Sequence, residues 1–292
     1  MRWEGNRQSD NVEDRRGQSY GGGGLIGGRG IGLGAVVVAL VAWGVFGINP
    51  LTTLGILSGG NPQVAQQSGP PARPPSPQED RQAVFVATVL ANTEDVWGQV
   101  FQQAGARYAP PKLVLYRGAT PTACGAGQAA MGPFYCPMDQ KVYLDLGFFD
   151  TMTRQLGSPG EFARAYVIAH EIGHHVQDLQ GITGKVDSQR RRLSQAQQNA
   201  LSVRVELQAD CYAGVWANRS EQAKRWLDPQ DIASAMNAAR QIGDDTLQKQ
   251  SRGYAVPDSF THGTSAERQR WFMQGYQSGS VGACDTFSAR SL

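Results

Sequence analysis

The chain has 292 residues, of which 27 are Lys or Arg and 25 are Asp or Glu, so its formal net charge is +2. This balance excludes a nucleic-acid binder that depends on bulk positive charge, and we expect no nucleic-acid partner. Because 40% of the residues are hydrophobic, the chain can bury a core, which excludes a wholly disordered protein.

The first two segments of the chain differ sharply in composition. Residues 1–30 are polar and rich in Gly and Arg, and we expect them to form a cytoplasmic tail. Residues 31–48 are an uncharged apolar run, which as a helix spans about 27 Å, close to the roughly 30 Å hydrocarbon core of a membrane. The run is long for a cleaved signal peptide, and no convincing cleavage site follows it. The sequence therefore predicts one retained transmembrane helix.

Basic residues lie on only one side of this apolar run. Arg15, Arg16 and Arg29 precede it within twenty residues, whereas the twenty residues after Ile48 contain no Lys or Arg. The positively charged flank of a membrane span stays in the cytoplasm. We therefore expect a single-pass protein of the cytoplasmic (inner) membrane, with a cytoplasmic N-terminus and a periplasmic or otherwise extracytoplasmic C-terminal domain.

The remainder of the chain divides into a linker and a folded domain. Residues 49–80 are rich in Pro, Gln, Ser and Gly, which predicts an extended linker. Residues 81–292 are expected to form one α+β, mainly α, domain. Hydrophobic periodicity and turn signals predict short strands at Lys112–Tyr116 and Lys141–Asp145, separated by a loop, and helices over Arg81–Gln103, Pro159–Gln180, Ser194–Asn218, Pro229–Ile242 and Ser265–Gln277.

All four cysteines lie in this domain, which is consistent with an oxidising compartment. Cys124 and Cys136 flank one loop and are expected to form a disulfide bond with each other. Cys211 and Cys284 would then form the second bond, although the sequence alone permits three pairings. Zinc binding by these thiolates is disfavoured because the chain contains no Cys-x-x-Cys pair.

Three of the four histidines lie in one short run within a predicted helix. His170 and His174 are four residues apart, so their side chains lie on one helix face, about 6 Å apart, and can bind one zinc ion. Glu171 lies close enough to act as a general base on water at the metal without being a ligand. The alternative, histidines solvated on a helix surface, is disfavoured because the neighbouring residues are apolar.

A catalytic zinc site needs a third protein ligand and one open position. Glu206 and Asp210 are again four residues apart on a predicted helix, where the alternative is an ordinary solvated face. We expect Glu206 to be the third ligand and Asp210 to accept a hydrogen bond from a ligating histidine. His262 is the other candidate for the third ligand.

The pattern His170-Glu171-x-x-His174 followed by Glu206-x-x-x-Asp210 resembles the gluzincin arrangement of metalloproteases. The whole chain resembles the bacterial putative neutral zinc metallopeptidase family of membrane-anchored proteins. Besides the zinc motif, the blocks that carry the resemblance are Asn11–Arg16, Gly132–Pro137, Glu206–Cys211 and Phe260–Gly263. The resemblance implies a zincin-like metalloprotease domain with a small β-sheet, a Zn²⁺ cofactor, and a peptide or protein as substrate.

The segment that begins at His262 is similar to a segment of the CAAX-processing membrane zinc proteases. That similarity implies that His262 and Arg268 face the metal and stabilise the oxyanion of the reaction. The sequence departs from that pattern because Gly263 occupies the position where proline is usual. A structural hydrogen bond at the start of a helix is the alternative role of His262.

These observations predict a zinc metalloendopeptidase in which Glu171 is the general base and His262 a second catalytic residue. Two other possibilities remain at this stage. One is a membrane-tethered binding or assembly factor whose zinc only stabilises the fold. The other is a soluble secreted protease, if residues 31–48 are removed from the mature protein.

Overall fold

The structure is a computed structural model, and it describes residues 1–18, 74–128, 132–154 and 160–292. Residues 1–17 and 73–292 form one compact unit. The predicted membrane span at 31–48 and most of the predicted linker lie outside the described residues. Among the helices that the structure does describe, none is long and apolar enough to cross a membrane.

The sheet of this unit is small and mixed. Its strands are β1 (Val12–Asp14), β2 (Lys112–Tyr116), β5 (Phe134–Cys136) and β6 (Lys141–Asp145), in the order β1-β2-β6-β5. β1 and β6 are parallel to β2, and β5 is antiparallel to β6. The predicted strands β2 and β6 are thus confirmed. The expected loop between them holds β5 and a hairpin of β3 (Ala119–Thr122) and β4 (Gly125–Gln128).

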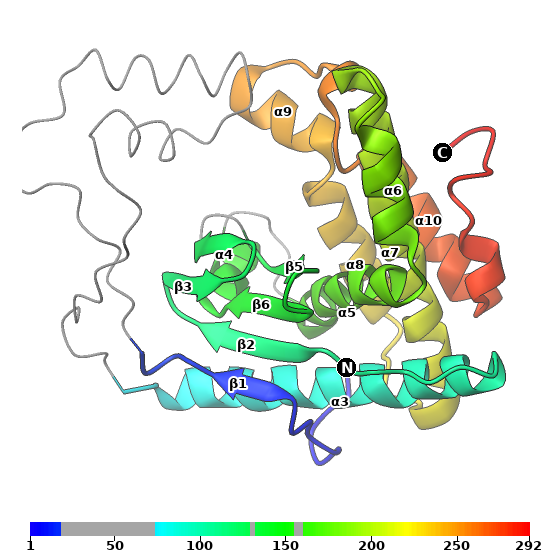
Figure 1. The fold of residues 1–292 in the computed structure, drawn as a ribbon. Helices are drawn as coiled ribbons and strands as arrows, with labels where there is room; N and C mark the ends of the chain where they lie inside the picture. The colour runs from blue at the N-terminus through cyan, green and yellow to red at the C-terminus, as the bar shows by residue number, and fades with distance from the viewer. Residues whose placement is uncertain (19–73, 129–131, 155–159) are drawn as a thin grey trace, which may run out of the picture. The chain divides into compact units, whose positions relative to one another are not determined.

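Residues 1–17, called the N-terminal block below, pack on the domain, whereas the sequence analysis assigned them to a separate tail. Val12 pairs with Leu113 in the β1–β2 ladder (Figure 1). Trp3 is 4% exposed, and its ring meets Phe85 edge-on at a centroid distance of 5.3 Å. The Met1 amine lies 2.8 Å from Asp228 Oδ2. The sequence of this block shows no hydrophobic periodicity, because the residues that it contacts all come from distant parts of the chain.

The β1–β2 pairing also bears on the predicted membrane topology. A ladder of backbone hydrogen bonds forms only between strands in one compartment. A single membrane pass at residues 31–48, with a cytoplasmic N-terminus and an extracytoplasmic domain, would place Val12–Asp14 and Lys112–Tyr116 on opposite sides of the membrane. That topology and the observed ladder are incompatible in one molecule.

Helices make up most of the domain. The long ones are α3 (Pro77–Gln103), α5 (Glu161–Leu179), α7 (Gln195–Lys224) and α10 (Ser265–Ser278), and the shorter ones are α4 (Gly147–Arg154), α6 (Ile182–Arg190), α8 (Asp231–Gln241) and α9 (Asp244–Arg252). The five predicted helices are confirmed with small shifts at their ends, and α4, α6 and α9 were not predicted. Capping boxes at Ser76, Ser194 and Thr264 start α3, α7 and α10 by satisfying backbone N–H groups that lack helical partners.

The core joins one face of α3 and the sheet to the helices that follow, with Leu90, Leu113, Phe162 and Trp216 among its fully buried side chains. Helices α7 and α10 cross at close range at Gly275. A Cβ on this residue would lie only 1.9 Å from the Cys211 carbonyl oxygen. Two disulfide bonds add cross-links. Cys124 is bonded to Cys136, and Cys211 to Cys284, which is the pairing favoured among the three that the sequence permitted.

Candidate metal centre

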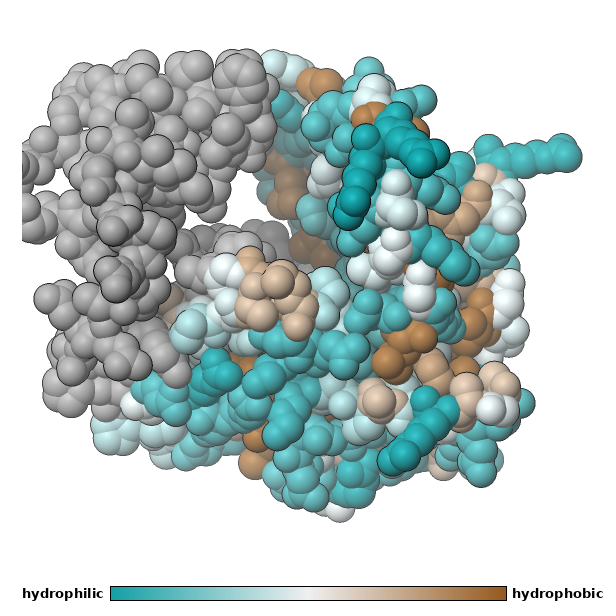
Figure 2. Space-filling view, in the orientation of Figure 1, coloured by the Kyte–Doolittle hydropathy of each residue, from teal (hydrophilic) through white to brown (hydrophobic). Residues whose placement is uncertain are grey.

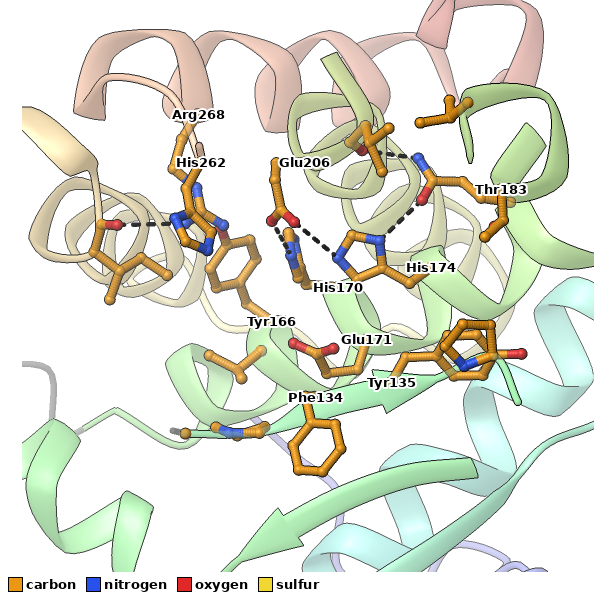
Figure 3. A pocket seen from close by; sticks show the side chains of 18 of the residues that line it. Phe134, Tyr135, Tyr166, His170, Glu171, His174, Thr183, Glu206, His262 and Arg268 are labelled. Carbon is orange, nitrogen blue, oxygen red and sulfur yellow. Dashed lines mark hydrogen bonds and ion pairs between the residues drawn. The ribbon is translucent and has the colours of Figure 1, made fainter. Parts of the chain in front are cut away.

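Three predicted ligands meet where α5 lies against α7. Glu206 Oε2 is 3.2 Å from His170 Nε2, and Glu206 Oε1 is 3.5 Å from His174 Nε2 (Figure 3). The ligand atoms of the three residues all lie within 4.8 Å of one another, and this is the group of potential metal ligands found in the described part of the chain. The i, i+4 spacing on α5 brings the imidazoles together, as the sequence predicts.

Gly173 allows α7 to approach close enough for this meeting. A Cβ at this position would lie 3.0 Å from the Ala209 carbonyl oxygen, which is tighter than ordinary contact. Gly173 lies between the two histidines on α5, and Ala209 is three residues beyond Glu206 on α7. The helices therefore touch beside the ligands, and the short Glu206 side chain can reach both imidazoles.

The donor set fits zinc. Two imidazole nitrogens and one carboxylate oxygen are the ligands of many catalytic zinc sites. Ligand atoms bound tetrahedrally at about 2.1 Å from a zinc ion lie roughly 3.4 Å apart. The separations of 3.2 and 3.5 Å between Glu206 and the two imidazoles match this spacing. His170, His174 and Glu206 are thus close enough together to hold one ion.

A buried ion network orients His170. Its Nδ1 lies 2.8 Å from Asp210 Oδ1, the contact expected from the sequence. Asp210 also accepts hydrogen bonds from the Tyr166 hydroxyl at 2.6 Å and from Arg268 Nε at 2.8 Å. Arg268 is 3% exposed, its guanidinium donates to Asp210 and Tyr166, and it also lines the cleft. With Nδ1 bonded to a carboxylate, His170 Nε2 is left to face the ligand position.

The charges around the ligands favour a cation at the site. Burial disfavours a charged His170, but the Asp210 and Glu206 carboxylates outweigh it and raise the pKa of His170 to about 10. Burial alone would raise the pKa of Glu206, yet the two histidines hold it well below the usual 4.5. Burial alone would raise the pKa of Asp210, but Arg268 and His170 outweigh this effect and lower the pKa to about 2. Metal binding therefore displaces a proton from His170, while the Glu206 carboxylate is already ionised.

Glu171 lies beside the ligands without joining them. Its carboxyl group is buried, which raises its pKa, while the neighbouring histidines act in the opposite direction. A backbone hydrogen bond from Tyr135 of β5 also stabilises its charged form. In Figure 3 the carboxylate points into the space between Glu206 and β5. A carboxylate with a raised pKa in this place suits transfer of a proton to and from water or substrate.

His262 enters the same cleft from the loop before α10. Its Nδ1 lies 3.3 Å from Asp244 Oδ1, and Asp244 Oδ2 accepts backbone N–H groups of Thr261, His262 and Gly263. This hydrogen bond, against the effect of burial, raises the pKa of His262 above 6.5. The side chain is 51% exposed, and among the described residues its Nε2 has no hydrogen-bond partner. The structure thus places His262 at the cleft but not among the ligands.

The cleft in front of the ligands has a volume of about 600 Å³. Apolar and aromatic side chains from β5, α4, α6 and α9 line it, namely Phe134, Tyr135, Phe148, Val186 and Leu247. Hydrophobic side chains gather at the hollow below α9 in Figure 2, whereas the outer surface there is mostly hydrophilic. β5 is an outer strand of the sheet, so one of its edges is unpaired in the described sheet.

Several site residues were not found by sequence reasoning. His175, the third histidine of the run, is buried and bonds the Ala109 carbonyl and the Tyr135 hydroxyl, so it joins α5 to β5. Asp244 precedes its partner by 18 residues, and no sequence signal connects the two. Gln177 could have been found, because it lies three residues after His174 on the same helix and bonds its Nδ1 at 2.9 Å.

The site thus combines a His-His-Glu cluster consistent with zinc, a buried carboxylate beside it and an open cleft. The chain belongs to the family described as "Putative neutral zinc metallopeptidase", whose sequence model matches residues 1–287. It is 54% identical over 293 residues to "Uncharacterized protein YpfJ" of Escherichia coli, covering 98% of this chain and 99% of the relative. It is 45% identical over 197 residues to "Uncharacterized protein Rv2575" of Mycobacterium tuberculosis, covering 63% and 65%. No solved structure matches the chain.

Proposed function

We propose that the protein is a zinc metalloendopeptidase that hydrolyses peptide bonds in the cleft between β5 and α9. One observation carries the proposal: a buried carboxylate, Glu171, lies beside a His-His-Glu ligand set at the base of an open cleft. A site that only stabilises the fold needs no such carboxylate. A zinc ion supplies Lewis acidity that polarises the scissile carbonyl and acidifies water.

Residues of the chain carry out the proton transfer, stabilise the developing negative charge and bind the peptide. Glu171 takes a proton from the attacking water and returns it to the leaving nitrogen. Protonated His262, held through Nδ1 by Asp244, donates a hydrogen bond from Nε2 to the substrate oxygen as it gains negative charge. The unpaired edge of β5 offers backbone groups to an extended peptide, and the apolar cleft wall receives its side chains.

We further propose that the protein is attached to a membrane through residues 31–48, which then enter the membrane without crossing it, and acts outside the cytoplasm. Two disulfide bonds support an oxidising compartment for the domain. The β1–β2 ladder supports an N-terminal block in the same compartment, so this proposal departs from the cytoplasmic N-terminus expected from flanking charges.

The test is to measure bound zinc per chain and cleavage of a generic unfolded protein, for the wild type and Glu171→Gln. We expect the variant to keep its zinc and to lose turnover by about 10²–10⁴-fold, because the general base is gone. Glu161→Gln, at the half-buried start of the same helix, is the matched control and should keep full turnover. Turnover retained in Glu171→Gln would remove the general-base role. Zinc binding without cleavage by the wild type would favour the tethered binding factor instead.

A further inference from the structure

The second metal ligand, His174, is oriented in a different way from His170. His174 Nδ1 lies 2.9 Å from Gln177 Oε1. Gln177 Nε2 lies 2.8 Å from the Val205 carbonyl oxygen and 3.0 Å from Gln208 Oε1. Because a carbonyl oxygen can only accept, the Gln177 nitrogen must face Val205, and its oxygen must face His174. His174 Nδ1 therefore donates, which leaves the lone pair of Nε2 for a metal.

The same reasoning extends the contacts one residue further. Gln208 Oε1 accepts from Gln177, so Gln208 donates its own N–H from Nε2 to the Cys284 carbonyl oxygen at 3.0 Å. Three hydrogen bonds thus run in one direction, from the imidazole through two amides to a backbone carbonyl. We call this series of hydrogen bonds, from His174 through Gln177 and Gln208 to Cys284, the relay. Gln177 is 1% exposed, Gln208 is 5% exposed and Cys284 is fully buried, so water has little access to replace a missing partner.

The far end of this relay is covalently fixed. Cys284 is bonded to Cys211, which lies three residues after Gln208 on α7. The disulfide thereby holds the accepting carbonyl against the same helix that carries Gln208 and Glu206. The C-terminal segment is held there a second time, because the Thr286 hydroxyl donates to the Arg204 carbonyl oxygen at 2.6 Å.

We propose that Gln177 and Gln208 are positioning residues for His174, and that the Cys211–Cys284 disulfide anchors them, so that zinc affinity depends on all three. The proposal deepens the proposed function and rests on its metal site. Loss of either amide leaves a buried donor or acceptor unpaired and frees the His174 ring to turn. Loss of the disulfide acts only through Gln208.

The experiment measures zinc affinity of the full chain by competition with a chelator, with no use of enzyme activity. Gln177→Met removes the acceptor at nearly constant volume, and we expect about 10–100-fold weaker zinc binding, the usual effect of losing a residue that orients a ligand. Gln208→Met should weaken binding less. The double variant should bind no more weakly than Gln177→Met, because residues of one relay are not additive.

Two further variants separate positioning from general destabilisation. Asn92→Leu breaks buried hydrogen bonds from Trp216 and Ser220, which take no part in the contacts of His174, and should destabilise the fold with unchanged zinc affinity. Replacing Cys211 and Cys284 together by Ser should weaken zinc binding in the wild-type background but not in Gln208→Met. Wild-type-like affinity in Gln177→Met, or an equal loss in Asn92→Leu, would overturn the relay alone. A wild type that binds no zinc would overturn both proposals.

Discussion

The metal centre and the N-terminal block lie in one compact unit, but different interactions hold them. At the metal centre, buried charges and hydrogen bonds orient side chains that come from two neighbouring helices, with Asp210 and Arg268 at its middle. The N-terminal block is held by a buried aromatic ring, a strand of three residues and ion pairs at the surface. Substitutions at the metal centre should therefore change chemistry and metal binding, whereas substitutions in the N-terminal block should change only stability.

The largest expected effect is on the labelling of the N-terminal block from outside the cell. This labelling depends on the compartment of the block and is all or none. Asp10→Cys places a thiol at an exposed position of the block, and Gln189→Cys places one on exposed α6 as the control. A membrane-impermeant maleimide applied to intact cells should label both, because the β1–β2 ladder keeps them in one compartment. Labelling of Gln189→Cys but not Asp10→Cys would show that the observed pairing does not form in the cell.

The next largest effect is expected at the buried ion pair. Arg268→Met leaves the Asp210 carboxylate buried without its cation, which should lower the free energy of unfolding by about 3–5 kcal/mol. Zinc affinity should fall as well, because Asp210 no longer holds His170 in place. Denaturant unfolding and chelator competition measure the two effects. Arg154→Met removes an exposed ion pair with Asp150 and should lower the free energy of unfolding by less than about 1 kcal/mol. An equal loss in the two variants would show that burial of the ion pair is unimportant.

A comparable loss of stability is expected from the N-terminal block, but without an effect on the metal. Trp3→Ala removes a buried ring that contacts Phe85, and unfolding should become easier by about 3 kcal/mol. Chelator competition should show unchanged zinc affinity. Tyr254→Ala, at an exposed aromatic residue, should leave both quantities nearly unchanged. A loss of zinc affinity in Trp3→Ala would show that the two regions are coupled.

The smallest effect is a shift in the pH profile of turnover. Asp244 raises the pKa of His262, so His262 stays protonated to higher pH than a free histidine and loses its proton as the pH rises through that pKa. Turnover should fall with the proton, because Nε2 then has no hydrogen to donate. Asp244→Asn should move this alkaline limb to lower pH, whereas Asp258→Asn, nearby in sequence and exposed, should not. An unmoved limb would exclude His262 as the titrating donor.

The fold was predictable where its signals are local. The helices α5 and α7 follow from hydrophobic spacing and from end signals such as Ser194, and both strands with continuous apolar runs, β2 and β6, were found. Short elements were missed: β1 and β5 have three residues each, which is too short for a period to show. Their stability comes from the neighbouring strand, and the sequence of the element alone carries little trace of it.

The sequence itself set each pair of candidate site residues, because residues four apart on a helix share a face, as His170 does with His174 and Glu206 with Asp210. The meeting of the two pairs depends on the packing of α5 against α7. What surrounds those ligands was decided by the tertiary structure. Asp244 reaches His262, Arg268 reaches Asp210, and Trp3 enters the core only because distant segments pack together. The physical reason is that helix geometry is set by the backbone within one turn, whereas these contacts depend on how whole helices and strands are placed.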